Sequence, residues 1–332
     1  MRRQIGVGLI EIMIALVISL FLIFGTITIY QQSRTMFRTN EAVARLQEAG
    51  RLAMDVMESD VRMASYWGLN NRAEYIVNRA GPGDPRPAPF TADQEPIINS
   101  CGGDDSNWAI DLDQYIAGTD GAYELECDTV PAGTAQAGTD TLTIRRAADA
   151  PPTVLDSDRI YLQTSRIQGT LFVPSSACTS PTDPTCIPAA YSPPASQSRQ
   201  LMVHSYYVSS QSSLRTDVPS LRRKSFANVN VAADAIEDEE IVPGVEDFQV
   251  RFGVDTNGDT NVDSYVDPDA VPAGAAVVAA TIWLRIRAED PEVGFVDGRD
   301  YQYAGMPAAV QFNDGFRRIV VSKTIQLRNT RI

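Results

Sequence analysis

The sequence predicts an α+β protein, in which one long N-terminal helix packs on an antiparallel β-sheet with long loops. Three features predict this class: an apolar run from Val7 to Tyr30, an alanine-rich stripe at helical spacing beyond it, and short segments rich in β-branched and aromatic residues further along. The 332 residues, 44% of them hydrophobic and 21% charged, are typical of a folded protein. Global disorder is therefore excluded.

The apolar run Val7–Tyr30 predicts a membrane-spanning helix. At about 1.5 Å per residue it is long enough to cross a hydrocarbon core about 30 Å thick. A secretory signal peptide would have about 7–15 apolar residues followed by a small-residue cleavage site, which is missing here, so we expect the segment to stay with the mature protein. Arg2 and Arg3 precede the run and no basic cluster directly follows it. The positive-inside rule therefore places the N-terminus in the cytoplasm and the rest outside.

Glu11 lies inside this run, where a carboxylate costs about 2.5–3.5 kcal/mol on membrane-insertion scales and marks a functional position. With Gly6 and the following Val7–Ile10, it resembles the type IV prepilin motif, although Val7 stands where that family usually has phenylalanine. The resemblance implies that prepilin peptidase cleaves after Gly6, that Val7 becomes the methylated N-terminus, and that Glu11 attracts the N-terminal amine of a neighbouring subunit. The alternative is a plain signal anchor with a stray glutamate.

Beyond the membrane the helix is expected to continue to about Ser65. Small apolar residues recur at steps of three and four, with a gap at Asp60, and the acid-first pairs Glu41–Arg45 and Glu58–Arg62 support the other face. A coiled-coil stalk is the alternative, but it would need a leucine seam. With the pilin resemblance, we expect a leader (1–6), a transmembrane part (7–30), an amphipathic helical part (31–65) and an extracytoplasmic β-rich head (66–332).

The head is expected to be an antiparallel sheet. Its predicted strands share β-branched and aromatic enrichment and are separated by intervals rich in proline and serine. They are Thr141–Arg146, Arg159–Gln163, Leu201–Val208, Glu246–Val254, Val277–Arg287 and Arg318–Leu327.

The four cysteines are expected to form disulfides, because an even number in an extracytoplasmic protein favours them. Four cysteines allow three connectivities, and nearest-neighbour pairing, Cys101 with Cys127 and Cys178 with Cys186, staples two loops that have little core of their own. Free buried thiols are the alternative.

An acidic segment that begins at Asp255 predicts a Ca²⁺-binding loop. Hard oxygen ligands alternate along it, as in the loop of an EF-hand. Its sixth and twelfth positions are Thr260 and Val266 instead of glycine and glutamate, and a polar hairpin turn at Asn257-Gly258 explains the same residues without an ion. Both readings stay open. The candidate ligands are the side chains of Asp255, Asn257, Asp259 and Asp263, and the backbone carbonyl of Asn261.

Several segments also resemble the PilW family of minor pilins, which is related to the J-type pseudopilins of type II secretion. The resembling segments are 48–51, 64–68, 242–255 and 324–329, and Ser65 and Leu69 stand where the family often has glycine and cysteine. The resemblance implies a scarce subunit that primes or caps pilus assembly at the tip, with other minor pilins, the major pilin and a PilY-type adhesin as partners. It would sit in the inner membrane before assembly and at the pilus tip afterwards.

Other functional classes find little support. The net charge of −14 would repel nucleic acid, and no CxxC pair, P-loop, G-x-S-x-G or H-E-x-x-H motif occurs. His204 is expected to be structural, and the acidic run Glu237–Glu240 to be a solvated face or turn. The sequence therefore predicts that the protein is not an enzyme. The alternatives to a minor pilin are a J-type pseudopilin and a membrane-anchored binding domain.

Overall fold

The computed structural model describes residues 8–79, 101, 108–125, 127–129, 133–183, 185–188, 195–229 and 235–330. The chain divides into two compact units, residues 1–48 and residues 49–332. The first unit is helical from Leu9 onward, and the second holds the end of the same helix and the described strands.

Helix α1, Leu9–Met63, is 55 residues long. Within its apolar part the hydroxyl groups of Ser19, Thr26 and Thr28 each donate a hydrogen bond to the carbonyl oxygen four residues earlier, at 2.7, 3.0 and 2.9 Å. These bonds satisfy the polar side chains within the helix, which keeps its outer surface apolar. Among the described residues, α1 is the one helix long and apolar enough to cross a membrane.

The end of α1 is fixed by the sheet that follows. Ser65 takes a φ of 62°, the left-handed conformation in which helices commonly end. Its N–H donates to the carbonyl of Arg145 at 3.3 Å, and the N–H of Ala147 donates to the carbonyl of Tyr66 at 2.6 Å. The chain therefore leaves the helix directly along strand β3.

The larger sheet has eight strands in the order β1-β5-β4-β6-β3-β2, with β7 on β6 and β8 on β7. Strand β6 is its centre, because it pairs with β4, β3 and β7 along its length. The strands are β1 (Ile76–Val77), β2 (Ile116–Thr119), β3 (Thr141–Ala147), β4 (Tyr161–Thr164), β5 (Gly169–Phe172), β6 (Gln197–Ser209), β7 (Ser220–Phe226) and β8 (Ile236–Pro243).

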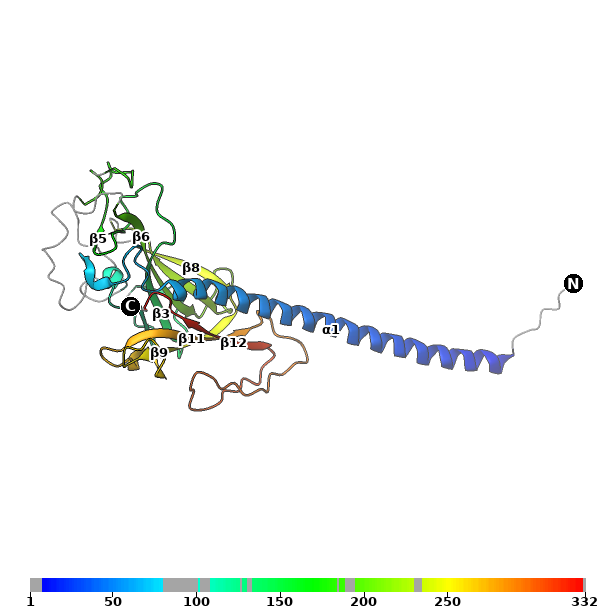
Figure 1. Cartoon of the computed structure of the whole chain (residues 1–332). Helices are drawn as coiled ribbons and strands as arrows, with labels where there is room; N and C mark the ends of the chain where they lie inside the picture. Colours follow the sequence, from blue (N-terminus) through cyan, green and yellow to red (C-terminus); the bar gives the residue numbers. More distant parts are fainter. Residues whose placement is uncertain are drawn as a thin grey trace. The chain divides into compact units, whose positions relative to one another are not determined.

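The smaller sheet is antiparallel, in the order β10-β9-β11-β12. Figure 1 labels its strands β9, β11 and β12. Helix α1 packs closely on this sheet at Gly50, where an added Cβ would lie 3.1 Å from Val321 and 3.2 Å from Ile286. A small residue is therefore required at that point of the helix. The strands are β9 (Val245–Asp255), β10 (Ser264–Val266), β11 (Ala276–Arg287) and β12 (Arg318–Gln326), and the short 3₁₀ helices are η1 (Ala73–Tyr75), η2 (Trp108–Ile110) and η5 (Pro268–Ala270).

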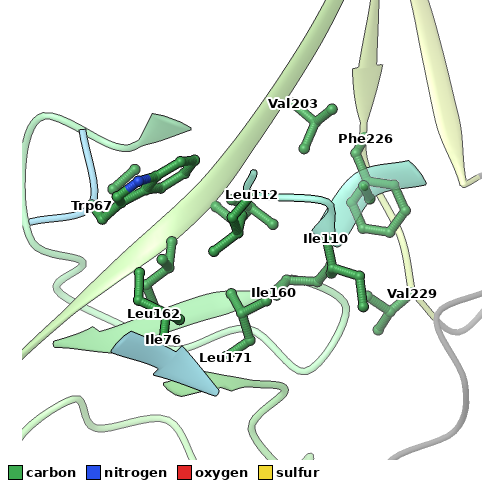
Figure 2. Packing of buried hydrophobic residues seen from close by; sticks show 13 residues of the cluster. Trp67, Ile76, Ile110, Leu112, Ile160, Leu162, Leu171, Val203, Phe226 and Val229 are labelled. Atoms are coloured by element: carbon green, nitrogen blue, oxygen red, sulfur yellow. The ribbon is translucent and has the colours of Figure 1, made fainter. Parts of the chain in front are cut away.

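One core cluster of the head lies where the chain after α1 meets the larger sheet. Figure 2 shows Trp67, Ile76, Leu162 and Leu171 pointing toward one another, with Ile110 from η2 beside them. All five side chains are at most 2% exposed. Full burial of one such side chain contributes about 1.5–3 kcal/mol, so this cluster anchors the first residues after the helix.

The predicted fold class is confirmed, with two corrections. The head contains two sheets instead of one, and the larger sheet is mixed, because β1 runs parallel to β5. All six predicted strands form, as β3, β4, β6, β9, β11 and β12. Strands β7 and β8 were not predicted, because their many charged residues conceal the apolar alternation on which the prediction depends.

Candidate functional sites on the helix and the acidic loop

Glu11 lies in the first turn of α1 and its side chain is exposed in the isolated chain. Its Oε2 accepts a hydrogen bond from the N–H of Gly8 at 3.4 Å, the arrangement in which a glutamate at the third helical position caps the helix start. The carboxylate also faces the positive end of the helix dipole. Gly6 and Val7, the predicted processing residues, lie outside the described residues.

Asp60, the gap in the apolar stripe of α1, is buried at the centre of a polar network. Its Oδ1 accepts from Nε and Nη2 of Arg146 at 3.0 and 2.8 Å, and its Oδ2 accepts from the hydroxyl of Tyr206 at 2.5 Å. Nδ1 of His204 lies 2.6 Å from the same Oδ2. Since an ionised carboxylate only accepts hydrogen bonds, this nitrogen carries a proton. One aspartate thus joins the helix to β3 and β6.

The network keeps Asp60 ionised. Burial raises the pKa of its carboxyl, but the hydrogen bond and charge of His204 and the charge of Arg146 outweigh burial, so the pKa lies well below its ordinary value. No residue of this network was predicted to be functional. Two signals were present in the sequence: one charged position in an apolar stripe, and a single histidine in an alternating strand. His204, predicted to be structural, is buried in this network beside Asp60.

The acidic run Glu237–Glu240 forms part of β8, and the predicted solvated face is wrong for half of it. Asp238 accepts from Tyr207 at 2.6 Å, Arg222 at 2.7 Å and Lys224 at 2.9 Å. Arg222 also lies 3.4 Å from Glu240. Opposite charges on neighbouring strands explain why β7 and β8 pair despite their polarity.

The predicted calcium loop follows β9 and is closed by its own hydrogen bonds. Asp255 accepts from the N–H groups of Asn257, Gly258 and Thr260, at 3.1, 2.7 and 2.7 Å. Asp263 accepts from the N–H and hydroxyl of Thr256, at 2.8 and 2.6 Å. The conformation of the loop is therefore fixed by hydrogen bonds among its own residues.

The backbone of this loop nevertheless has one EF-hand property. Thr260 occupies the sixth position, where EF-hands require glycine, and it takes a φ of 66°. Burial raises the pKa of the Asp255 carboxyl, but the backbone N–H groups that donate to it lower the pKa by more, so the pKa lies below its ordinary value. The hydrogen bonds from Thr256 lower the pKa of Asp263.

The side chains of Asp259 and Asn257, two further candidate ligands, accept hydrogen bonds from backbone N–H groups of the loop. Oδ1 of Asp259 accepts from the N–H of Asn261 at 2.8 Å, and Oδ1 of Asn257 accepts from the N–H of Asp259 at 2.9 Å. The nearby Asp267 is paired with Arg251 at 2.9 Å. Within the described ranges, no group of three or more histidine, cysteine or acidic side chains is arranged to hold a metal ion. Calcium binding therefore requires these side chains to turn inward.

The four cysteines form two disulfides in the structure. Cys101 is joined to Cys127, and Cys178 is joined to Cys186, which is the nearest-neighbour arrangement. Each bond closes a short loop of the head, across 26 and 8 residues of sequence.

Residues 205–329 match the family model of PilW, described as type IV pilus-assembly protein W. The matched region runs from the middle of β6 to just beyond β12 and includes the acidic loop. No curated protein and no solved structure matches the chain.

Proposed function

We propose that this chain, which matches the PilW family of type IV pilus proteins over residues 205–329, is a minor pilin that primes or caps pilus assembly. In this proposal prepilin peptidase cleaves after Gly6, Val7 is methylated, and the mature chain joins other minor pilins at the pilus tip. The family match carries the proposal. The apolar half of α1, together with the family, indicates membrane anchoring.

The position of Glu11 supports a role in assembly. Among the described residues of a single chain, its carboxylate accepts one weak hydrogen bond, from the N–H of Gly8 at 3.4 Å. Inside a filament the surroundings are apolar, and an unpaired carboxylate is costly there. The free N-terminal amine of a neighbouring subunit would compensate that charge, and only in one axial register.

The size of the head supports a position at the tip. Residues 49–332 form one compact unit. A bulky head beyond the helix obstructs lateral packing in a shaft, whereas at the end of a filament it has room. There it could contact the major pilin below and a PilY-type adhesin above.

Replacement of Glu11 with glutamine tests the proposal. We expect pili per cell, counted by electron microscopy, to fall at least about tenfold, because loss of one charge-assisted contact of about 1.4 kcal/mol per interface already changes assembly tenfold. Glu41→Gln is the matched control, since Glu41 lies on the same helix and forms an exposed pair with Arg45. It should leave piliation unchanged.

Mass spectrometry of the mature N-terminus, with and without prepilin peptidase, tests processing separately. Cleavage after Gly6 and methylation of Val7 are expected only when the peptidase is present. An intact Met1 in the wild type, or normal piliation in Glu11→Gln, would contradict the proposal. If Glu11→Gln abolished protein secretion and left the pili intact, the J-type pseudopilin function would be favoured instead. A fluorescent tag should label tips, and uniform shaft labelling would contradict priming.

Calcium binding by the loop Asp255–Asp263 is a second proposal, supported by the glycine-like backbone of Thr260 and the charged state of Asp255 and Asp263. The affinity expected for an extracytoplasmic site is about 10⁻⁴–10⁻³ M. Calorimetric titration of the full chain with CaCl₂ should show one site that is lost in Asp263→Asn. No heat and no change in melting temperature at about 5 mM calcium would refute it.

A further inference from the structure

Strand β12 forms one edge of the smaller sheet. It pairs with β11 along its whole length, from Ala279 opposite Gln326 to Arg287 opposite Arg318. In the part of the chain that the structure describes, no strand pairs with its other side. A sheet edge of this kind presents a row of N–H and C=O groups that another strand can bind.

The register shows which groups face outward. The N–H of Leu327 donates to Val278 at 3.0 Å, and the N–H of Ala288 donates to Arg317 at 2.8 Å. Hydrogen-bonded pairs alternate with non-bonded pairs in an antiparallel ladder, so odd-numbered residues of β12 bond to β11 and even-numbered ones point away. The outward groups therefore belong to Val320, Ser322, Thr324 and Gln326.

At both ends of this outward row the backbone groups form hydrogen bonds within the chain. Nη2 of Arg299 donates to the carbonyl of Arg318 at 2.7 Å. At the other end the N–H of Arg328 donates to the carbonyl of Arg62, at the end of α1, at 3.4 Å. Between these two contacts lies an open segment of seven residues, 320–326, which is long enough for one strand of ordinary length.

The other described edges are protected in the ways that proteins usually protect them. Strands β1, β2 and β10 have only two, four and three residues. Strand β8 is long, but it carries four consecutive acids and ends at Pro243. The exposed side chains of β12, from Val320 to Gln326, are all uncharged. Lys323 points toward α1 and is paired there with Glu58.

A cleft of about 390 Å³ lies at the C-terminal end of the open segment. It is lined by Arg62, Arg328 and the residues 324–327 between the open edge and the helix end. Arg62 and Lys323 share the single carboxylate of Glu58, whose pKa is lowered first by its hydrogen bond to Lys323. With Arg328, the local charge is positive on a chain whose net charge is −14. The cleft thus favours a carboxylate.

We propose that β12 docks an extended strand of another pilus subunit by β-strand addition, with a carboxylate of that strand in the cleft between Arg62 and Arg328. The backbone groups of 320–326 supply the hydrogen bonds, and the two arginines fix the register. This inference rests on the proposed function and names the contact by which the chain joins its partners.

A second copy of this chain is the less favourable occupant. If two copies of β12 paired antiparallel about Ser322, Arg328 of one copy would lie opposite Phe316 of the other, beside its Arg317 and Arg318. Phe316 carries no carboxylate, and Arg317 and Arg318 are already paired with acids of their own copy, so the cleft would hold no acid of the second copy. The occupant to which the charge distribution points is therefore a different subunit that carries an acid.

Site-specific photocrosslinking in cells that assemble pili tests this. A photoreactive amino acid at Val320 of the full chain should crosslink to another pilus subunit, and mass spectrometry should map the product to an extended segment next to an acidic residue. Ser322→Pro removes an outward N–H without touching the ladder to β11 and should lower the yield about tenfold, whereas Ser322→Ala should not. The same photoreactive amino acid at Glu239, on the acidic edge strand β8, should give no such product.

Arg328→Glu provides a second variant that leaves the strand intact and should also reduce the yield. Melting temperatures of the variants show that the head still folds. A crosslink that is unaffected by Ser322→Pro and Arg328→Glu, a product with a second copy only, or no product while pili form would overturn the inference. Pili that form normally without this chain would instead contradict the proposed function, so the two failures are distinguishable.

Discussion

Replacement of Asp60 with alanine removes the acceptor at the centre of the helix–sheet network. Four donor atoms point at its two oxygens: Nε and Nη2 of Arg146, Nδ1 of His204 and the hydroxyl of Tyr206. The side chains of Arg146 and His204 are only 13% and 6% exposed, and Tyr206 is fully buried. Water therefore cannot replace the carboxylate without opening the interface.

The expected loss of stability is about 3–5 kcal/mol at pH 7, because the change leaves a buried arginine charge without its partner. For a domain of this size that corresponds to a fall in melting temperature of about 10 °C. The effect should depend on pH. The folded pKa of Asp60 lies below its ordinary value of 3.8, so its contribution is present above about pH 4 and is lost as pH falls toward the folded pKa.

Chemical denaturation of the wild type and variants at pH 7 and pH 3 measures this. Asp55→Ala is the matched control, because Asp55 lies on the same helix with a side chain 58% exposed and 3.6 Å from Arg51. It should cost at most about 0.5 kcal/mol. In an Arg146→Ala background the cost of Asp60→Ala should fall by about 1–3 kcal/mol. A loss no larger than that of the Asp55 control would refute the reasoning.

Three further predictions follow from the strained and buried groups of the head. Ser65→Gly should raise the free energy of unfolding by about 1 kcal/mol in chemical denaturation, because Ser65 takes a φ of 62°, whereas Ser65→Ala should give no gain. Thr260→Gly should stabilise by a similar amount of about 1 kcal/mol and should tighten calcium binding in calorimetry, because a β-branched residue at a φ of 66° is strained; an unchanged or lower stability would contradict this. Burial raises the pKa of Asp140 to about 7, against the hydrogen bonds from Gly121 and Val250. The folded state then keeps a proton that the unfolded state releases, so stability should fall as pH rises from about 4 to 7, and Asp140→Asn should lack that slope in denaturation measured across the range.

Local patterns predicted the elements whose own residues favour a helix or a strand. The apolar run and the alanine stripe predicted α1 to within two residues of its end at Met63, and strands such as β9 and β11 followed from β-branched and aromatic residues. Strand β7 was not predicted because arginine and lysine occupy it. This composition is favourable in a strand because the acids of β8 lie opposite. Pairing partners that lie far apart in sequence leave no periodic signal.

Residues close together in the chain specified the long helix, its apolar half with Glu11, and six of the strands, because these depend on residues within a few turns or a few pleats of one another. The packing of distant elements brings Asp60 to His204, which is 144 residues away, and leaves one edge of β12 unpaired among the described strands. Whether a charge is buried or an edge is paired depends on which elements pack together. That choice is made by the summed burial and hydrogen bonding of the whole head, and no short stretch of residues contains it.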